Sequence, residues 1–446
     1  MTQLARTIAL RSAILLVVSS IVGSGVFKKV APMAAELGSP LLVLGCWIGA
    51  GIISMAGALS NAEMAGMFPD SGGEYVYYQK VYGRFFAFLY GWGSFAVMKT
   101  ATIAAMAYVF GQSLVPVLGL SDEAADGAIK AIASLLILGL SWINYRGVSF
   151  AEGLSRALTY LMFGAVAVIL LIGFQAQSGS IANLNQPVHL TNQNPNLLNA
   201  ITIALLGAFW GYEGWNYIGF IGEEVKNPQR TIPMALGIGT LIVIGIYLLL
   251  NVVYMYVLPI DTLAQLAQTP NKIAAVEVVR QASGWLGAVF ISCLILVTTF
   301  NSTNASILMS ARIFYAMARD GVFFQSAARI HDKYQTPSVA IFLQGVWSVA
   351  LVWSGTFDQL TDMLIFASFI FYGATALGVL LLRRKYPDLP RTYRVIGYPV
   401  VPALFCLFCA GLVIMTLINQ PREALIGLGL MATGVPFYWF WQRQRT

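Results

Sequence analysis

Long apolar stretches recur along the whole chain and are separated by short polar segments. Twelve of them are long enough to cross a hydrocarbon core of about 30 Å as helices. Their approximate limits are 10–35, 40–66, 84–117, 128–147, 155–176, 198–222, 232–258, 284–312, 336–354, 358–383, 398–418 and 422–441. Because a helix satisfies its own backbone hydrogen bonds in lipid, this pattern predicts an all-α membrane protein with twelve transmembrane helices.

The composition also indicates that much of the protein surface faces lipid. Charged residues make up 10% of the chain, against about 25% in an ordinary soluble domain. Apolar and aromatic residues make up 58%, and the 42 glycines suit a bundle in which helix backbones approach closely. A soluble protein of this length could not cover itself with so few charges.

The distribution of basic residues predicts the orientation. With the N-terminus in the cytoplasm, 19 of the 26 Lys and Arg residues fall on the inner side, 6 fall outside, and Lys99 lies within a helix. This bias predicts a multi-pass protein of the inner membrane with both termini cytoplasmic. The net charge of +7 is then a topology signal, so we expect membrane lipid and no nucleic acid as partners.

Two of the predicted helices are interrupted by glycine pairs. The first carries Ile-Val-Gly-Ser-Gly-Val-Phe at 21–27, and the sixth carries Phe-Trp-Gly-Tyr-Glu-Gly-Trp-Asn-Tyr at 209–217. They lie five helices apart and start on opposite sides, which is typical of an inverted-repeat transporter with helices unwound at the midplane. We therefore predict one domain over 1–446, made of a first repeat, an inverted second repeat and two extra helices, with limits 10–176, 198–383 and 398–441. Taken alone, a Gly-x-Gly pair is equally typical of close helix packing.

Such breaks suit a zwitterionic ligand. Backbone groups freed at membrane depth must line a cavity and meet a polar partner. The amide N–H groups of Ser24, Gly25 and Val26 begin a half-helix and suit a carboxylate, and we expect non-helical backbone at Ser24 and Gly25. The carbonyl of Ile21 and those of residues 210–213 end a half-helix and suit an ammonium. An α-amino acid carries both groups on one carbon.

Several motifs in order resemble the amino acid–polyamine–organocation superfamily, and more narrowly its L-type amino acid transporter branch and the bacterial serine/threonine exchangers. The first is the segment 21–27 quoted above. The others are Ala-Glu at 62–63, Phe-Pro-Asp-Ser-Gly-Gly-Glu-Tyr at 68–75, Gly-Trp-Asn-Tyr at 214–217, Gly-Glu-Glu-Val-Lys-Asn-Pro at 222–228, Asn-Ala-Ser at 304–306, Ala-Arg-Asp-Gly at 318–321 and Tyr-Pro-Asp-Leu-Pro-Arg-Thr-Tyr-Arg at 386–394. Each motif is loose, but their order and spacing are specific.

The resemblance implies a five-plus-five inverted-repeat (LeuT-like) fold that works by alternating access. By position it implies that Ser24 and Gly25 bind substrate carboxylate, Ile21 binds substrate amine and Trp210 takes the place of an aromatic gate. Together with the residues beside the breaks, the predicted substrate-binding set is Ile21, Gly23, Ser24, Gly25, Val26, Trp210, Gly211, Tyr212 and Glu213. The animal relatives join a glycoprotein through a Cys in the outer loop, but residues 119–128 contain none. We therefore expect no disulfide-linked partner.

Three ionisable residues in or near the spans are candidates for gating or coupling, beside Trp210. Glu213 and Lys99 lie at membrane depth, where a charge is costly and often functional. They could also form a structural ion pair with each other. Glu63, near the inner end of the second helix, is a further gating candidate.

Secondary transport is the function that these features favour: exchange or proton-coupled uptake of neutral amino acids. A cationic amino acid or polyamine carrier is the alternative, since Glu213 could hold a second positive charge, and a channel would not need two opposed breaks. Metalloprotease, serine-hydrolase and phosphate-loop motifs are missing from the sequence, so we predict neither an enzyme nor a pump. We also expect no cofactor and no metal, because the four Cys and two His are dispersed.

Overall fold

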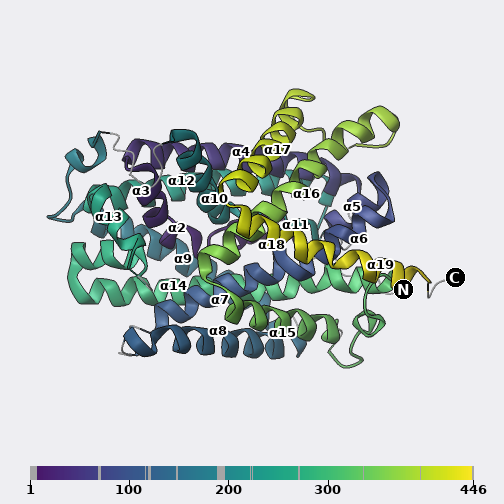
Figure 1. The fold of residues 1–446 in the computed structure, drawn as a ribbon, viewed down its shortest axis with the longest axis horizontal. Coiled ribbons are helices and arrows are strands. Elements are labelled where there is room, and N and C mark those ends of the chain that lie inside the picture. Colours follow the sequence, from purple (N-terminus) through teal and green to yellow (C-terminus); the bar gives the residue numbers. More distant parts are fainter. Residues whose placement is uncertain are drawn as a thin grey trace.

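The computed structural model describes residues 8–443 except 69–71, 116, 119–121, 147–148, 188–195, 221, 223–224, 270–271, 335 and 392. Within these residues every regular element is a helix, and the long helices lie side by side in a bundle (Figure 1). Residues 69–71, 223–224 and 392 of the motifs quoted above lie outside the described part.

The predicted apolar runs correspond to single helices or to groups of two or three consecutive helices. Ten spans are long and apolar enough to cross a membrane. Two further apolar helices, α10 (Leu197–Tyr212) and α15 (Ser338–Ser354), are shorter. The other principal helices are α4 (Pro40–Met67), α6 (Arg84–Gly93), α7 (Lys99–Leu114), α8 (Asp122–Tyr145), α9 (Ser149–Phe174), α12 (Pro228–Val257), α14 (Ala274–Arg319), α16 (Phe357–Lys385), α17 (Val400–Asn419), α18 (Pro421–Ala432) and α19 (Gly434–Arg443). The prediction of an all-helical membrane protein is confirmed, whereas the repeat boundaries and the midplane position of the breaks stay predictions.

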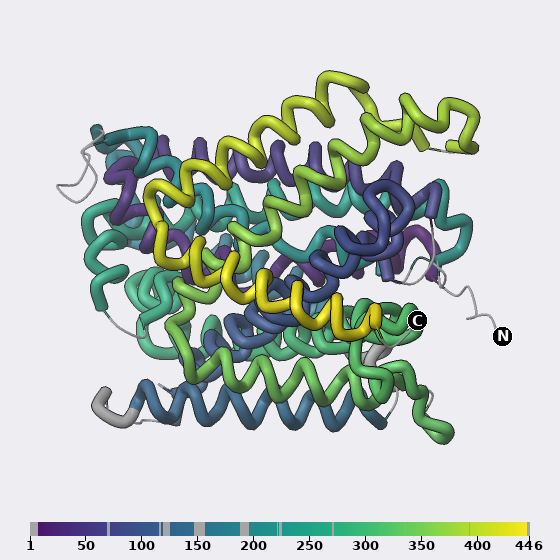
Figure 2. Tube along the Cα trace, turned by 45° about the vertical axis from the view of Figure 1, so that its right-hand side comes forward, coloured from purple at the N-terminus to yellow at the C-terminus, as the bar shows by residue number. Residues whose placement is uncertain are grey.

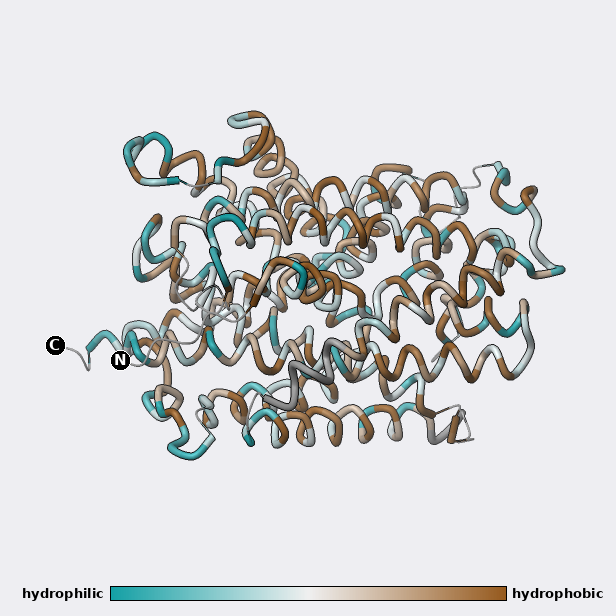
Figure 3. Tube along the Cα trace, turned by 180° about the vertical axis from the view of Figure 1, so that it is seen from behind, coloured by the Kyte–Doolittle hydropathy of each residue, from teal (hydrophilic) through white to brown (hydrophobic). Residues whose placement is uncertain are grey.

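Hydropathy and chain ends agree with a membrane bundle. Hydrophobic residues run along the helices, and hydrophilic ones gather toward the ends (Figure 3). The first and last described residues lie at the same end of the bundle (Figures 1 and 2), as the predicted twelve crossings require. Which membrane side this is remains the prediction made from basic residues.

Two long spans are less regular than the sequence indicated. The third run contains a π-helical segment, Ser94–Met98, between α6 and α7. The eighth run belongs to a 46-residue element, α14, which bends at Gly284 with φ of 70°. A positive φ is accessible to glycine without steric cost, so this residue joins two helices at an angle. Short helices outside the apolar runs include α5 (Glu74–Val81) and α13 (Ile260–Ala267).

Both expected breaks are present. Helix α1 (Leu10–Ile21) ends before residues 22–24, and the chain continues as α2 (Gly25–Lys28) and α3 (Val30–Leu37). Helix α10 ends at Tyr212, and α11 (Tyr217–Phe220) follows after four turn residues. In Figure 1, α2, α10 and α11 lie in the interior of the bundle, enclosed by other helices.

The exact extent of the first break differs from our expectation. Val22 is extended (ψ of 96°), but Ser24 has right-handed helical angles and Gly25 already belongs to α2. The expectation of non-helical backbone at Ser24 and Gly25 is therefore wrong. The chain leaves the helical conformation at Val22, and helical backbone angles resume at Ser24.

Candidate functional site

The two breaks cross in contact, and glycines make the crossing possible. A Cβ on Gly25 would overlap the Cα of Gly211 and lie 2.9 Å from its amide nitrogen. A Cβ on Gly214 would overlap the carbonyl oxygen of Ser20, whose hydroxyl donates to the Gly214 carbonyl at 3.0 Å. Gly214 also has φ of 112°, a conformation that other residues rarely adopt. The predicted close approach of the first and sixth helices is thus built into the backbone.

The first break leaves polar groups unused. The hydroxyls of Ser24 and Ser302 and the indole N–H of Trp210 are buried, and within the described residues none of them has a hydrogen-bond partner. Ser302 belongs to α14, and its Oγ lies 3.5 Å from where a Cβ on Gly23 would be. Because buried polar groups normally find partners, this group of donors and acceptors is suited to a polar ligand.

The start of α2 supplies backbone donors beside these side chains. The first bond of this half-helix runs from the Lys28 amide to the Ser24 carbonyl, at 3.2 Å. The amides of Gly25, Val26 and Phe27 therefore have no acceptor inside the helix. This set shares Gly25 and Val26 with the carboxylate donors predicted from the sequence, and their role in binding stays a prediction.

A tyrosine from α12 closes the carbonyl ends of both half-helices. The Tyr247 hydroxyl donates toward the Ile21 carbonyl at 3.0 Å and the Gly211 carbonyl at 2.7 Å. These two oxygens belong to residues that we predicted to bind a substrate ammonium. Tyr212 lies in the same cluster, with its hydroxyl on the Trp47 carbonyl at 3.1 Å. An incoming ammonium would have to compete with the Tyr247 hydroxyl for these two carbonyl oxygens.

Glu213 does not stand alone at the second break. Its carboxylate lies 3.3 Å from the Lys99 ammonium, and the Tyr372 hydroxyl donates to its two oxygens at 2.9 and 2.8 Å. Both charged side chains are 3% exposed. Lys99 also lies 4.5 Å above the ring of Tyr217, at the start of α11. Glu213 and Lys99 therefore form the ion pair that the sequence allowed, and their role in gating or coupling stays a prediction.

A second buried carboxylate ties α5 to the same break. Glu74 Oε1 accepts from the amides of Asn61 at 3.0 Å and Asn216 at 2.8 Å, and Tyr90 donates to Oε2 at 3.3 Å. Burial raises the pKa of the Glu74 carboxyl, although the Lys99 charge and the Asn216 hydrogen bond oppose the rise. Most polar side-chain atoms of the second break are therefore bonded within the protein, although the Asn216 Oδ1 atom has no partner among the described residues.

An aromatic and charged layer covers one side of the crossing. The ring of Trp210 meets that of Phe357 edge to face, with centroids 5.9 Å apart. The Lys28 ammonium lies 4.2 Å from the Phe357 centroid, and Lys29 forms a 2.6 Å ion pair with Asp358. Trp210, the predicted gate, thus contacts a layer that joins α2 to the start of α16.

Glu63 belongs to a separate layer at the opposite end of α16. Arg383 donates to both of its oxygens, at 2.8 and 2.6 Å, and the Val395 amide donates at 2.7 Å. The Arg391 guanidinium lies 3.5 Å away. This network fastens α4 to the end of α16 and to the segment that follows it, and a gating role of Glu63 stays a prediction.

Sequence reasoning missed Ser302, Tyr247 and Tyr372. For Ser302 a signal existed: α14 carries a run of small polar residues, Thr298 to Ser306, inside a long apolar stretch, and most of them are buried. Buried polar groups in a membrane helix indicate function or helix contact. Tyr247 and Tyr372 are single tyrosines in apolar helices, and no pattern separated them from ordinary core residues.

Metal chemistry finds no support in the part of the chain that the structure describes. There, no three His, Cys, Asp or Glu side chains gather into a possible metal site. All four cysteines are free, and two of them, Cys46 and Cys409, are buried.

Interrupted helices that cross at glycines, with unused polar groups beside one break, are typical of membrane carriers whose substrate binds between half-helices. The chain belongs to the amino acid permease family, whose pattern it matches over residues 8–440. This confirms the membership that the motifs indicated.

The chain is similar over its length to amino acid transporters of animals and bacteria. It is 29% identical to the human cystine/glutamate transporter over 98% of this chain and 85% of that protein. It is 29% identical to the mouse large neutral amino acids transporter small subunit 2, over 99% of this chain and 82% of that protein. It is 28% identical to the serine/threonine exchanger of Bacillus subtilis, over 99% and 98%.

Proposed function

We propose that this chain exchanges neutral α-amino acids across the membrane by alternating access around the crossing of α1, α2, α10 and α11. The observation that carries the proposal is the first break, where the unpartnered hydroxyls of Ser24 and Ser302 adjoin the free amides at the start of α2. Its relatives support the same class of substrate, since their names describe transport or exchange of amino acids.

In the proposed mode, the substrate carboxylate accepts from the amides of Gly25, Val26 and Phe27 and from a serine hydroxyl. The substrate ammonium meets the carbonyls of Ile21 and Gly211, in competition with the Tyr247 hydroxyl. Both contacts involve only the backbone-like part of an amino acid, so the side chain is left to the surrounding walls.

A neutral side chain is favoured because Glu213 offers no unbalanced charge. Its carboxylate is paired with Lys99 and bonded to Tyr372. A cationic substrate would have to displace the Lys99 ammonium from this buried position, which costs several kcal/mol. We therefore prefer neutral amino acids to cationic amino acids or polyamines.

Alternating access follows from the two closing layers. The Trp210–Phe357 contact and the Lys29–Asp358 pair close one side, and the Glu63–Arg383 pair closes the other. The distribution of basic residues assigns the first layer to the outside and the second to the cytoplasm. Opening one layer while the other stays bonded would expose the site to one side only.

We further propose that the chain resides in the inner membrane with both termini cytoplasmic and works without a disulfide-linked partner. The absence of Cys from residues 119–128 supports the second point.

Purified protein in proteoliposomes tests the function directly. Vesicles loaded with unlabelled amino acids are assayed for uptake of labelled serine or leucine, with and without a proton or sodium gradient. Exchange predicts that internal neutral amino acid stimulates uptake severalfold, whereas internal lysine or spermidine does not. Equal uptake into empty and loaded vesicles would contradict exchange, and stimulation by lysine alone would favour the cationic alternative.

A further inference from the structure

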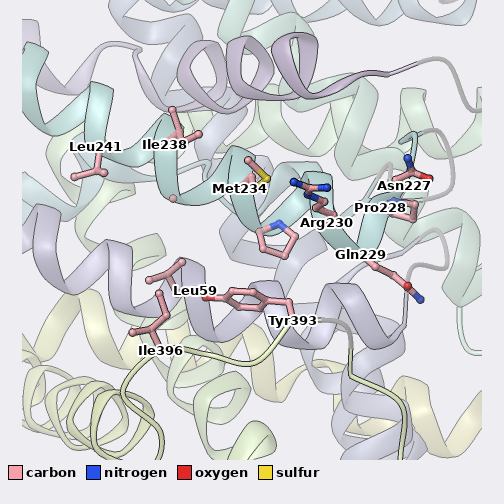
Figure 4. Close-up of a pocket in the computed structure, with 12 residues that line it drawn as sticks. Leu59, Asn227, Pro228, Gln229, Arg230, Met234, Ile238, Leu241, Tyr393 and Ile396 are labelled. Atoms are coloured by element: carbon pink, nitrogen blue, oxygen red, sulfur yellow. The ribbon is translucent and has the colours of Figure 1, made fainter.

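A large groove lies away from the crossing of the two breaks, beside the first half of α12. Its volume is about 1000 Å³, and its walls come from α12, from α4 and from the segment that follows α16. Figure 4 shows Leu59, Tyr393 and Ile396 facing a row of α12 side chains across the groove. Neither the proposed substrate site nor the closing layers use this space.

The row on α12 changes from polar to apolar along the helix. Arg230, Met234, Ile238 and Leu241 are spaced by four, four and three residues, so they lie on one helix face. Met234, Ile238 and Leu241 are 37%, 39% and 59% exposed, and Ile396 opposite is 70% exposed. An exposed apolar wall of this kind faces hydrocarbon in a membrane protein.

Gly237 leaves open space at the floor of the groove. A Cβ on Gly237 would meet only the Cδ2 of Leu59, at 3.8 Å, so the position is open. From Arg230 to Leu241 the helix rises roughly 16 Å, at 1.5 Å per residue. This is about one leaflet of a hydrocarbon core of about 30 Å. The groove therefore has the length of an acyl chain that enters from one membrane surface.

Arg230 places a positive charge at the polar end of the groove. Arg230 is exposed there beside Asn227 and Gln229, at the N-terminus of the 30-residue helix α12. Arg394, close in sequence to Tyr393 and Ile396, is exposed as well. Glu63, four residues after Leu59 on α4, is bonded to Arg383. A guanidinium and a helix N-terminus together favour a phosphate over an uncharged group.

We propose that this groove binds one anionic phospholipid, with its phosphate at Arg230 and an acyl chain along Met234, Gly237, Ile238 and Leu241. Under the orientation proposed above, the lipid comes from the cytoplasmic leaflet, where anionic headgroups attract basic residues. The lipid bridges α12, which carries Tyr247, and the segment 393–396, which adjoins the Glu63 network. It thereby holds together two parts of the molecule that border the inner closing layer.

Two substitutions test the contact with the lipid headgroup and the contact with the acyl chain separately. Arg230→Gln removes the positive charge from an exposed position and leaves the groove open. Gly237→Leu fills the floor without a backbone clash and keeps the charge. Gly245→Leu is the matched control, because Gly245 lies on the same helix outside the groove, with no atom within 4 Å of an added Cβ.

The experiment uses delipidated full-length protein, to which phosphatidylglycerol or phosphatidylcholine with identical acyl chains is added. Native mass spectrometry counts the bound lipids, and the thermal shift of each variant is recorded. Wild type and Gly245→Leu are expected to retain phosphatidylglycerol at least fivefold better than phosphatidylcholine. Arg230→Gln should lose this preference, and Gly237→Leu should bind both lipids severalfold less.

Two results would overturn the proposal. One is wild-type retention of both lipids to the same extent, and the other is unchanged phosphatidylglycerol binding by Gly237→Leu. Glycerol phosphate, added alone, distinguishes a lipid from a free phosphate compound. If it reproduces the thermal shift of phosphatidylglycerol, the site binds a soluble phosphate and the lipid proposal is wrong. None of these readouts depends on amino acid transport.

Discussion

The two helix breaks both expose polar groups inside the bundle, but they differ in how many of these groups have partners within the protein. At the break between α1 and α2, buried hydroxyls of Ser24 and Ser302 have no partner among the described residues. At the break between α10 and α11, Glu213 is bonded to Lys99 and Tyr372, and Asn216 is bonded to Glu74. The first break has polar groups to offer to a ligand, and the second has most of its groups occupied.

The difference suggests a division of roles between breaks that sequence alone makes look equivalent. A break that the protein satisfies itself can keep its shape without substrate, and it can serve as a support for the other one. A break with unused donors gains most from a bound ligand. Substitutions at the first break should therefore change transport and affinity, and those at the second should change stability.

The largest effect is expected for Gly25→Val. Its side chain would overlap the backbone of Gly211, so the two breaks could no longer cross, and transport should fall below detection. Uptake in proteoliposomes and the amount of folded protein are measured together. Gly45→Val is the control, because nothing lies within 4 Å of a Cβ there. Normal uptake by Gly25→Val would disprove the contact between the breaks.

Breaking the ion pair at the second break is expected to cost stability first. Glu213→Gln leaves the Lys99 ammonium buried without its partner, which should destabilise the protein by about 3 kcal/mol. Adding Lys99→Met should restore part of the loss, because the unpaired charge is removed. Thermal unfolding of both single variants and the double variant measures this coupling.

The same variants distinguish a structural role of Glu213 from a role in proton coupling. If Glu213 instead carries a proton, Glu213→Gln should flatten the pH dependence of uptake while stability and exchange stay close to wild type. Additive losses in the double variant would likewise show that the pair does not act as a unit.

Removing one hydroxyl from the first break should weaken binding moderately. Ser302→Ala and Ser24→Ala each delete a group that we expect to bond substrate, at about 1 kcal/mol, or a roughly fivefold weaker apparent affinity. Ser113→Ala is the comparison, since that hydroxyl bonds to the Val109 carbonyl of its own helix. Concentration dependence of uptake is the measurement. Unchanged affinity in both break variants would place the carboxylate elsewhere.

The smallest effect is expected from Glu74→Gln, and it depends on pH. Burial raises the pKa of Glu74, so the folded state holds this proton more tightly than the unfolded state. In the wild type, the stabilisation that this tightly held proton contributes is fully present below about pH 4.3. It is lost as the pH rises through the higher pKa that Glu74 has in the folded state. Glutamine keeps an oxygen for Asn61 and Asn216 but cannot ionise.

Unfolding temperatures measured between about pH 4 and 8 test the direction of this pH dependence. Relative to wild type, Glu74→Gln should gain stability as the pH increases from about 4 to 8. A constant difference across that range would mean that Glu74 does not titrate there.

How much the sequence predicts depends on the kind of signal. The apolar runs predicted the spans because lipid requires continuous apolar helices, and α4 (Pro40–Met67) agrees closely with the run at 40–66. The breaks were predicted because glycine pairs interrupt otherwise regular runs, although the helix resumes at Gly25. The partners of Glu213 required the fold, since Lys99 and Tyr372 lie 114 and 159 residues away. Sequence alone suggested the Lys99 pair as an alternative and did not suggest Tyr372.

The π-helical segment Ser94–Met98 has a consequence for how this chain tolerates length changes. There the Lys99 amide bonds to the Ser94 carbonyl, five residues back, so the turn holds one residue more than a regular turn. Deleting one residue of this segment would restore ordinary helical winding and change the direction of α7 against α6 very little, because four α-helical residues turn the chain about as far as five π-helical ones. Lys99 would then still face Glu213, whereas deleting one residue from the regular helix α6 would rotate Lys99 by about 100°. The segment can therefore absorb the loss of one residue, which the regular helix beside it could not.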